Sequence, residues 1–239
     1  MGAETSEIRS DQGIEDVFTN LLEGYRFTVC ETQEEVAEAL EVRCRVYADA
    51  GYAIPIPDEY DHRSWHLRAE EVSTGRCVGT MRITPRLMGS FEAEEYFTLP
   101  AELRGPRCFE ITRFAILPEH RRDRTQIPGV AFGLFRLCYD VATTAGGTVG
   151  VVCSKASRAW TYTSMGFDPT GLVAAYEKLN GAEHEVLAVD FTDAHEFLRD
   201  NPFRTLFLDM TFPEVIVPNR RPPLGLVPDT REFRYAVGA

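Results

Sequence analysis

A carboxylate and a guanidinium lie inside an otherwise apolar part of the chain. The run from Cys108 to Leu117 is rich in aromatic and β-branched residues, which predicts a buried strand, yet it contains Glu110 and Arg113. Glu110 can serve as a catalytic base, or it can be the buried ion-pair partner of an arginine. Residues three apart in a regular strand face opposite sides, so both charged side chains line one site only if the strand bulges.

A basic turn and a helix follow this strand. Arg121, Arg122 and Arg124 lie in the turn, and apolar residues recurring on one face predict a helix over 129–144. At the junction, the sequence Gln126-Ile-Pro-Gly-Val-Ala131 combines a glycine that permits close backbone approach with a proline suited to a first helical turn. Unpaired amides at such a helix start can hold a phosphate.

Two motifs in this region resemble known families. Gln126-x-x-Gly129-x-Ala131 is similar to the loop with which the GCN5-related N-acetyltransferase superfamily holds the pantetheine-pyrophosphate arm of an acyl carrier. Glu110-Ile-Thr-Arg113-Phe-Ala resembles the E-x-x-R-(F/L)-A strand of its autoinducer-synthase-like branch. That branch includes acyl-homoserine lactone synthases, N-acyl amino acid synthases and exosortase-associated acyltransferases.

Further matches to this branch lie upstream. Val42-Arg-Cys-Arg-Val-Tyr47 is similar to a conserved helix end of the branch, and Asp58-Glu-Tyr-Asp61 to its D-x-Y/F-D loop. Val78-Gly-Thr-Met-Arg82 extends the resemblance. By this correspondence, the residues that shape or bind the acceptor site are Arg43, Tyr47, Asp58, Asp61, Arg82 and Arg113. Tyr47 stands where lactone synthases usually have Phe, and the R-x-R-x-Y pattern is closer to the N-acyl amino acid synthases.

The resemblance implies a reaction in which an amine attacks a thioester carbonyl. Glu110 is then the base, and Tyr162, four residues before Gly166-Phe167, is the acid for the leaving thiolate. Tyr162 can instead be an aromatic core residue. Backbone N–H groups near 114–117 are the expected oxyanion donors. Asp58 and Asp61 could hold the acceptor's ammonium group, or could only cap a turn.

The acyl donor is expected to bind at the basic turn. Arg121, Arg122 and Arg124 fit the docking of an acidic acyl carrier protein, or of the phosphates of coenzyme A, with Gln126, Gly129 and Ala131 at the phosphopantetheine. The alternative is that these arginines form an ordinary solvated loop. We expect no permanently bound cofactor, with acyl-ACP or acyl-CoA as co-substrate.

The composition limits the class of protein. The chain has 239 residues, 44% of them hydrophobic, enough for one sizeable domain. Its formal net charge of -12 argues against a nucleic-acid partner. The sequence has no apolar run near the roughly 20 residues of an integral membrane segment and no signal-peptide pattern, so we expect a cytoplasmic protein. The 6 cysteines and 5 histidines are scattered, and we expect no metal site.

The pattern of elements predicts an α/β (α+β) fold. The expected elements, in order, are strand 25–30, helix 32–47, loop 51–61, strands 66–71 and 76–84, a short helix within 91–103, strand 108–117, helix 129–144, strand 148–154, a helix over about 155–166, and a hairpin of 173–179 with 185–191. With the resemblance, this order implies the GNAT-like acyl-CoA N-acyltransferase fold, a mixed, mainly antiparallel sheet flanked by helices. We divide the chain into an N-terminal extension with a short amphipathic helix (1–24), the acyltransferase domain (25–199) and a Pro-rich C-terminal extension packed on it (200–239). We expect this last part to be an extended arm over the surface.

The expected function is transfer of a fatty acyl group from a carrier thioester to the α-amino group of an amino acid or related small amine. Such a product is an N-acyl amino acid-type signal or lipid, as in quorum sensing. An acyl-homoserine lactone synthase that uses S-adenosylmethionine is one alternative. A catalytically silent protein that binds an acyl ligand or acyl carrier is another, because a fold does not guarantee activity.

Overall fold

The structure is a computed structural model that describes residues 13, 15–121, 129–193, 198–199, 201, 203–210 and 221–228. Its strands are β1 (Tyr25–Val29), β2 (Trp65–Glu71), β3 (Arg76–Pro85), β4 (Cys108–Ile116), β5 (Val149–Lys155), β6 (Asp168–Tyr176) and β7 (Ala182–Asp190). Its labelled α-helices are α2 (Gln33–Asp49), α3 (Gly129–Thr144) and α4 (Ala159–Thr163), and residues 15–22 are also helical.

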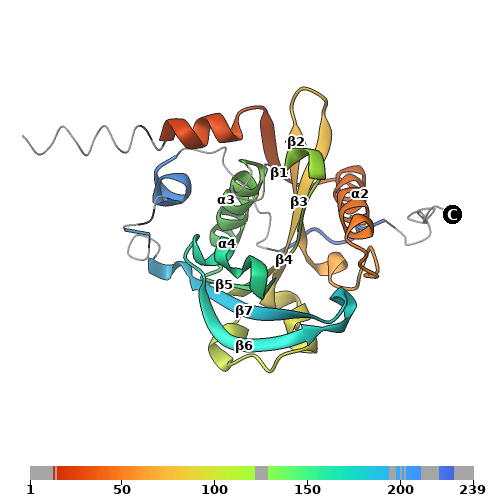
Figure 1. The fold of residues 1–239 in the computed structure, drawn as a ribbon, viewed down its shortest axis with the longest axis vertical. Coiled ribbons are helices and arrows are strands. Elements are labelled where there is room, and N and C mark those ends of the chain that lie inside the picture. The colour runs from red at the N-terminus through yellow and green to blue at the C-terminus, as the bar shows by residue number, and fades with distance from the viewer. Residues whose placement is uncertain are drawn as a thin grey trace, which may run out of the picture.

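The strands form one sheet in the order β1-β2-β3-β4-β5-β7-β6. All neighbouring strands are antiparallel except β4 and β5, which are parallel. Helix α2 covers one face of the sheet, and α3 lies on the other (Figure 1). This mixed, mainly antiparallel sheet with flanking helices confirms the predicted fold class.

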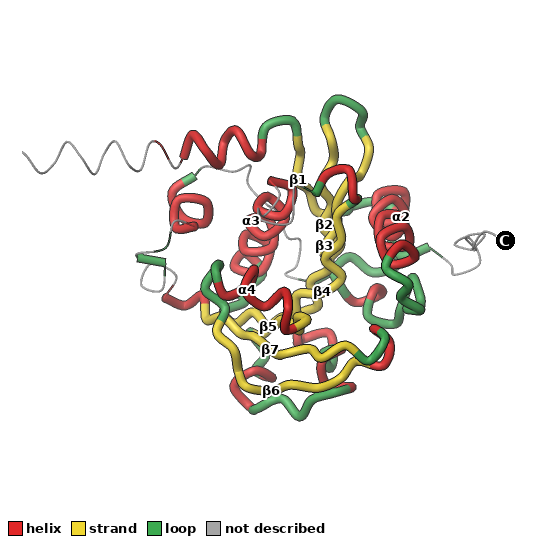
Figure 2. Tube along the Cα trace, in the orientation of Figure 1, coloured by secondary structure: helices red, strands yellow, loops and turns green. Residues whose placement is uncertain are grey.

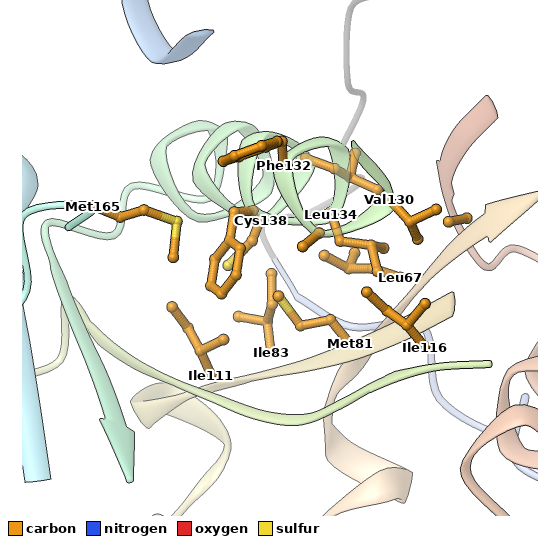
Figure 3. Packing of buried hydrophobic residues seen from close by; sticks show 14 of the residues in the cluster. Leu67, Met81, Ile83, Ile111, Ile116, Val130, Phe132, Leu134, Cys138 and Met165 are labelled. Atoms are coloured by element: carbon orange, nitrogen blue, oxygen red, sulfur yellow. The ribbon is translucent and has the colours of Figure 1, made fainter. Parts of the chain in front are cut away.

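The face of the sheet under α3 is apolar. Figure 3 shows Leu67, Met81, Ile83 and Ile111 of the strands packed against Leu134, Cys138 and other side chains of α3. These residues alternate along their strands with side chains that face α2, as the two-residue period of a strand requires. Burying each such aliphatic side chain contributes about 1.5–3 kcal/mol. This layer fixes the register of β2, β3 and β4.

The α2 face of the same strands is polar and also buried. Its side chains, all under 9% exposed, are His66, Arg68, Glu70, Thr80, Arg82, Thr84 and Glu110. Helix α2 begins where the sequence predicts, because the Thr32 hydroxyl accepts a hydrogen bond from the Glu35 N–H at 3.2 Å. A polar face that is closed to solvent is an unusual sheet surface, and it holds the candidate site.

The parallel strands β4 and β5 pair over a short distance. Their register runs from Cys108 opposite Val149 to Ile111 opposite Val152, although β4 continues to Ile116 and β5 to Lys155. Beyond Ile111 the two strands therefore do not pair with each other. We call residues 112–116 and 153–155 the β4–β5 split.

Strand β4 contains the bulge that the sequence requires. Thr80 pairs with Ala115 and Arg82 with Thr112, so two residues of β4 stand opposite one residue of β3. One of the two, Arg113, has a φ of 55°, in the left-handed region. The bulge brings the Arg113 side chain to the face that Glu110 occupies.

The connection between β3 and β4 consists of short helical turns, which lie beside β6 and β7 (Figure 2). They include the 3-10 helices Glu92–Glu95 and Ala101–Arg104, in the stretch where we predicted a short helix. Tyr96 stacks on Tyr176 of β6 at 3.9 Å between ring centroids. This contact holds the connection against the far half of the sheet.

Two predicted elements differ from the structure. The helix expected over about 155–166 is a 3-10 turn, Ala156–Arg158, followed by the five residues of α4, because β5 extends to Lys155. Residues 205–209 form a helical turn where an extended arm was predicted. The predicted hairpin is confirmed, with Asn180 at a φ of 59° and Gly181 at 68° in its turn.

Part of the C-terminal extension lies against α2. Gln33 Nε2 donates a hydrogen bond to the Gly225 carbonyl at 2.9 Å. Leu226 and Val227 pack with Ile56 on the apolar side of α2. Among the described helices, none has the length and apolar character that a membrane crossing needs. The three-part division of the chain stays a prediction.

Candidate active site

Three arginines and three carboxylates form a buried network on the polar face of the sheet. We call it the charge network, and its members are Arg43, Asp58, Asp61, Arg82, Glu92 and Arg113. Each of these side chains is at most 10% exposed. Three positive and three negative charges balance, which offsets part of the cost of taking them out of water.

The network joins α2 to β3 and the loop between them. Arg43 donates to both oxygens of Asp61, at 2.6 and 3.0 Å. Arg82 Nη1 donates to Asp58 Oδ1 at 2.5 Å and to Asp61 Oδ1 at 3.1 Å. Burial alone would raise the pKa of Asp61, but the Arg43 and Arg82 guanidiniums hold it well below its usual range. Asp61 is therefore a permanent anion.

Arg113 connects the bulge of β4 to the same network. Its Nε and Nη2 donate to Asp58 Oδ2 at 3.0 and 2.7 Å, and its Nη2 also donates to Glu92 Oε1 at 2.6 Å. Arg82 Nη2 donates to the other oxygen of Glu92 at 2.8 Å. Glu92 thus links Arg82 of β3 to Arg113 of β4.

Asp58 and Asp61 also cap the turn between them. Asp58 Oδ1 accepts the backbone N–H of Tyr60 at 2.9 Å, and Asp61 Oδ2 accepts the N–H of Asp58 at 2.7 Å. Both aspartates are therefore engaged by arginines and by the backbone. This geometry favours the turn-capping alternative over direct contact with an acceptor ammonium.

Glu110 lies beside the charge network and is held by the backbone. Its Oε2 accepts the Glu92 N–H at 2.9 Å and its Oε1 accepts the Ala93 N–H at 2.8 Å. Within the described part of the chain, it forms no ion pair with an arginine. Burial, and then the nearby Glu92 carboxylate, raise the pKa of Glu110 from 4.5 to about 7. Glu110 therefore changes charge near neutral pH, as a general base must.

Two tyrosines border the β4–β5 split. Tyr47 of α2 is close enough to affect the charge states of both Arg113 and Tyr162, and its ring contacts Tyr52 at 5.8 Å between centroids. Tyr162 of α4 packs edge-on against Phe135 and Phe167, at 5.6 and 5.8 Å. Burial raises the pKa of Tyr162, so its hydroxyl keeps its proton. The ring contacts of Tyr162 are those expected of an aromatic core residue. Its hydroxyl has no hydrogen-bond partner among the described residues.

The predicted donor-binding residues are described only in part. Arg122, Arg124 and Gln126 lie outside the described residues. Arg121 is exposed and its Nε donates to the Ile116 carbonyl at 2.6 Å, at the end of the split.

Gly129 and Ala131 are buried at the start of α3. A Cβ on Gly129 would lie 1.9 Å from the Leu21 carbonyl oxygen, so the helix over 15–22 can approach α3 only because this residue is glycine.

The sequence reasoning missed several residues near this site. Glu92 carries no motif, and the predicted site, with three arginines and the carboxylates of Asp58, Asp61 and Glu110, was already balanced in charge, so no signal in the sequence pointed to it. Arg158 lies in electrostatic range of Arg121 and extends the basic surface. The pairing of Lys155 with Tyr52, which meet beside the split, had no signal in the sequence.

The described residues contain no group of three or more histidine, cysteine, aspartate or glutamate side chains placed to hold a metal ion. The candidate site is thus a buried acid of raised pKa, a balanced ion network and a sheet that splits between β4 and β5. The raised pKa of Glu110 allows this arrangement to accept a proton near neutral pH.

Comparison with known proteins identifies the fold and the family. The structure resembles that of FeeM, an N-acyl amino acid synthase from uncultured soil microbes, with a TM-score of 0.61 and 15% identity over 74% of this chain and 96% of that chain. It also resembles BjaI, a coenzyme A-dependent acyl-homoserine lactone synthase, with a TM-score of 0.56 and 21% identity over 77% and 90%. The lactone synthase LasI gives a TM-score of 0.56 and 16% identity over 81% and 96%.

At these identities the solved structures show a shared fold. A search of curated proteins found no match. The family model of the N-acyl amino acid synthase FeeM matches residues 38–190, which is more than half of the chain. The match includes Arg43, Glu110 and Arg113, and it confirms the resemblance that these motifs indicated. The chain therefore belongs to the FeeM N-acyl amino acid synthase family and is an N-acyltransferase.

Proposed function

We propose that this acyltransferase moves a fatty acyl group from a carrier thioester to the α-amino group of an amino acid or related small amine. The observation that carries this proposal is Glu110, a fully buried acid whose pKa is raised to about 7 next to the β4–β5 split. A base of this pKa can take a proton from an ammonium group at neutral pH. The thioester is a co-substrate, and the reaction uses no bound cofactor.

The proposed reaction consumes two protons of the acceptor's ammonium group. Glu110 takes the first through a water molecule, since both its oxygens already face backbone N–H groups. The free amine attacks the thioester carbonyl, the new C–N bond forms and the C–S bond breaks. Tyr162 donates its hydroxyl proton to the leaving thiolate and regains one from the nitrogen of the tetrahedral intermediate. The products are an N-acyl amide and a free thiol.

Backbone amides of β4 are the proposed oxyanion donors. The Leu117 N–H cannot serve, because it donates to the Val78 carbonyl of β3 at 2.9 Å. Alternation along the strand directs the Ile116 amide the other way, toward the split. The Phe114 amide follows Arg113 in the bulge, where the regular pairing with β3 is interrupted, and it is the second proposed donor. Of the amides expected over 114–117 as oxyanion donors, we therefore propose those of Phe114 and Ile116.

The proposed site for the acyl chain is an apolar cavity on the α3 side of the split. Its space is about 10 Å³, near the volume that one water molecule needs, so an acyl chain enters only if the lining moves. The lining includes Leu198 and Phe207, which lie in the segment after β7; its other residues are Ile111, Phe135, Cys138, Tyr139, Met165, Phe167 and Phe191. An apolar lining of this kind suits a hydrocarbon chain.

An acyl carrier protein is the proposed form of the donor. Arg121 and Arg158 lie close together at the mouth of the split, and Arg122 and Arg124 follow in the sequence. Acyl carrier proteins are typically acidic, and the overall charge of -12 opposes their approach. Screening over roughly 8–10 Å limits this repulsion at physiological salt, whereas the arginines would touch the partner directly.

The function is tested by incubating the purified protein with acyl carrier protein thioesters or acyl-coenzyme A and a panel of amines. Formation of an acyl amide, detected by mass spectrometry, supports the proposal, and its absence with every pair contradicts it. S-adenosylmethionine belongs in the panel. Release of methylthioadenosine would identify a lactone synthase instead.

A further inference from the structure

We propose that Lys155, together with Tyr52, forms a subsite that binds the carboxylate of the acceptor and so selects α-amino acids over simple amines. This inference rests on the proposed function, because it concerns the acceptor of that reaction. It is drawn from an ammonium group whose described partners include no carboxylate.

Lys155 is one of two lysines in the chain, and the two have different surroundings. Lys178 forms an ion pair with Glu95 at 2.5 Å. Lys155 is half-buried, and in the described part of the structure its Nζ is hydrogen-bonded to the Tyr52 hydroxyl and lies 4.7 Å from the centre of the Tyr52 ring. Its partners among the described residues are a phenol and an aromatic face, so no carboxylate of the described part of the chain compensates its positive charge, although the chain has 37 acidic residues.

Lys155 lies on the face of the sheet that carries Glu110, where the acceptor is proposed to bind. Glu110 stands opposite Val151 in the parallel register, and Cys153 and Lys155 follow on the same face of β5 at steps of two residues. Cys153 lies within electrostatic range of Glu110. From the other side, Tyr52 contacts Tyr47, which is in electrostatic range of Arg113.

The neighbouring guanidiniums are already occupied. Arg43 and Arg113 each pair with two carboxylates of the charge network, and Arg82 pairs with three. An acceptor carboxylate would have to displace one of those partners to reach them. At Lys155 it meets an ammonium with three donors and the Tyr52 hydroxyl beside it, so it can accept from both.

The test compares an amino acid with the amine that lacks its carboxylate. L-phenylalanine and phenethylamine form one such pair, and L-leucine and isoamylamine a second, each assayed with the same acyl donor. For Lys155→Met, we expect the ratio of kcat/KM for amino acid to kcat/KM for amine to fall roughly 10- to 100-fold, as the loss of a charge-assisted hydrogen bond predicts. The rate with the simple amine should stay within twofold of wild type.

Two variants complete the design. Lys155→Arg keeps the charge and should retain most of the preference for the amino acid. Lys178→Met removes the only other lysine and should leave the ratio unchanged. Equal losses for amino acid and amine in Lys155→Met, or no loss at all, would overturn the subsite.

A failure of the proposed function gives a different result. If the wild type acylates none of these amines, that function is wrong, and the subsite is measured separately by calorimetry of L-phenylalanine and phenethylamine binding. Weaker binding of phenylalanine to Lys155→Met than to wild type, with phenethylamine unchanged, supports the subsite. The absence of phenylalanine binding, or equal binding to both proteins, overturns it.

Discussion

Arg113 holds Asp58 by two hydrogen bonds, at 3.0 and 2.7 Å from its Nε and Nη2, although 55 residues separate them in the sequence. The left-handed φ of Arg113 directs this guanidinium across the sheet face. The bulge and the loop that carries Asp58 therefore depend on each other.

Replacing Arg113 should be strongly destabilising. Arg113→Met leaves Asp58 and Glu92 buried with fewer positive partners, and we expect a loss of about 3–5 kcal/mol in urea unfolding. Asp58→Asn in the same chain restores the charge balance, so the double variant should lose less than the sum of the single losses. Arg45→Met, which breaks the exposed pair with Glu119, should cost less than about 1 kcal/mol. Additive losses would show that the network does not act as a unit.

The rate of acyl transfer should depend on the ionisation of Glu110. Because the pKa of Glu110 is about 7, kcat should rise with pH and level off above that value. Glu110→Gln should remove this limb of the profile and lower kcat roughly 10²- to 10⁴-fold. A Glu110→Gln enzyme that keeps the wild-type pH profile would show that another group is the base.

The same shift predicts how stability changes with pH. The pKa of Glu110 is raised on folding. Its contribution to the free energy of unfolding is therefore largest below about pH 4.5 and is lost as the pH rises through about 7. Between pH 5.5 and 8, the free energy of unfolding of the wild type should fall by about 2 kcal/mol more than that of Glu110→Gln. In Glu110→Gln, the side-chain NH₂ group faces one of the two backbone N–H donors, those of Glu92 and Ala93, and cannot accept its hydrogen bond. This should lower the free energy of unfolding by about 1–3 kcal/mol at any pH. Urea unfolding at both pH values tests this, and parallel losses would contradict the shift.

Tyr162→Phe separates the hydroxyl from the ring. The contacts with Phe135 and Phe167 involve the ring, so the free energy of unfolding should stay within about 0.5 kcal/mol. The single-turnover rate should fall roughly 10²-fold if the hydroxyl protonates the thiolate. An unchanged single-turnover rate would leave Tyr162 as a core aromatic residue.

Arg122 and Arg124 are the better choice for testing carrier docking, since the Arg121 side chain is tied to the Ile116 carbonyl. Reversing both to glutamate should raise the KM for a carrier-linked donor, and added salt should slow association of the wild type. The KM for acyl-coenzyme A serves as the comparison. If carrier kinetics were unchanged and acyl-coenzyme A were the better donor, the basic turn would be a solvated loop.

The sequence predicts most of this fold because periodicity and turn residues are local. The bulge followed from the odd spacing of Glu110 and Arg113 once both were assigned to one site. Glu92 could not be predicted in this way, because its role depends on a 3-10 helix that brings its backbone N–H to Glu110. The pairing of Lys155 with Tyr52 joins residues 103 apart, and no local pattern encodes such a contact.

The short pairing of β4 with β5 leaves the sheet as two units, β1 to β4 and β5 to β7. Four registered residue pairs join these units, so amides in 112–116 that face the split should exchange with solvent faster than their depth in the protein suggests. The pantetheine arm of the proposed donor contains amide groups, which can hydrogen-bond to the backbone of β4 and β5 where these strands do not pair with each other. Binding of the proposed donor would then link the two units by hydrogen bonds.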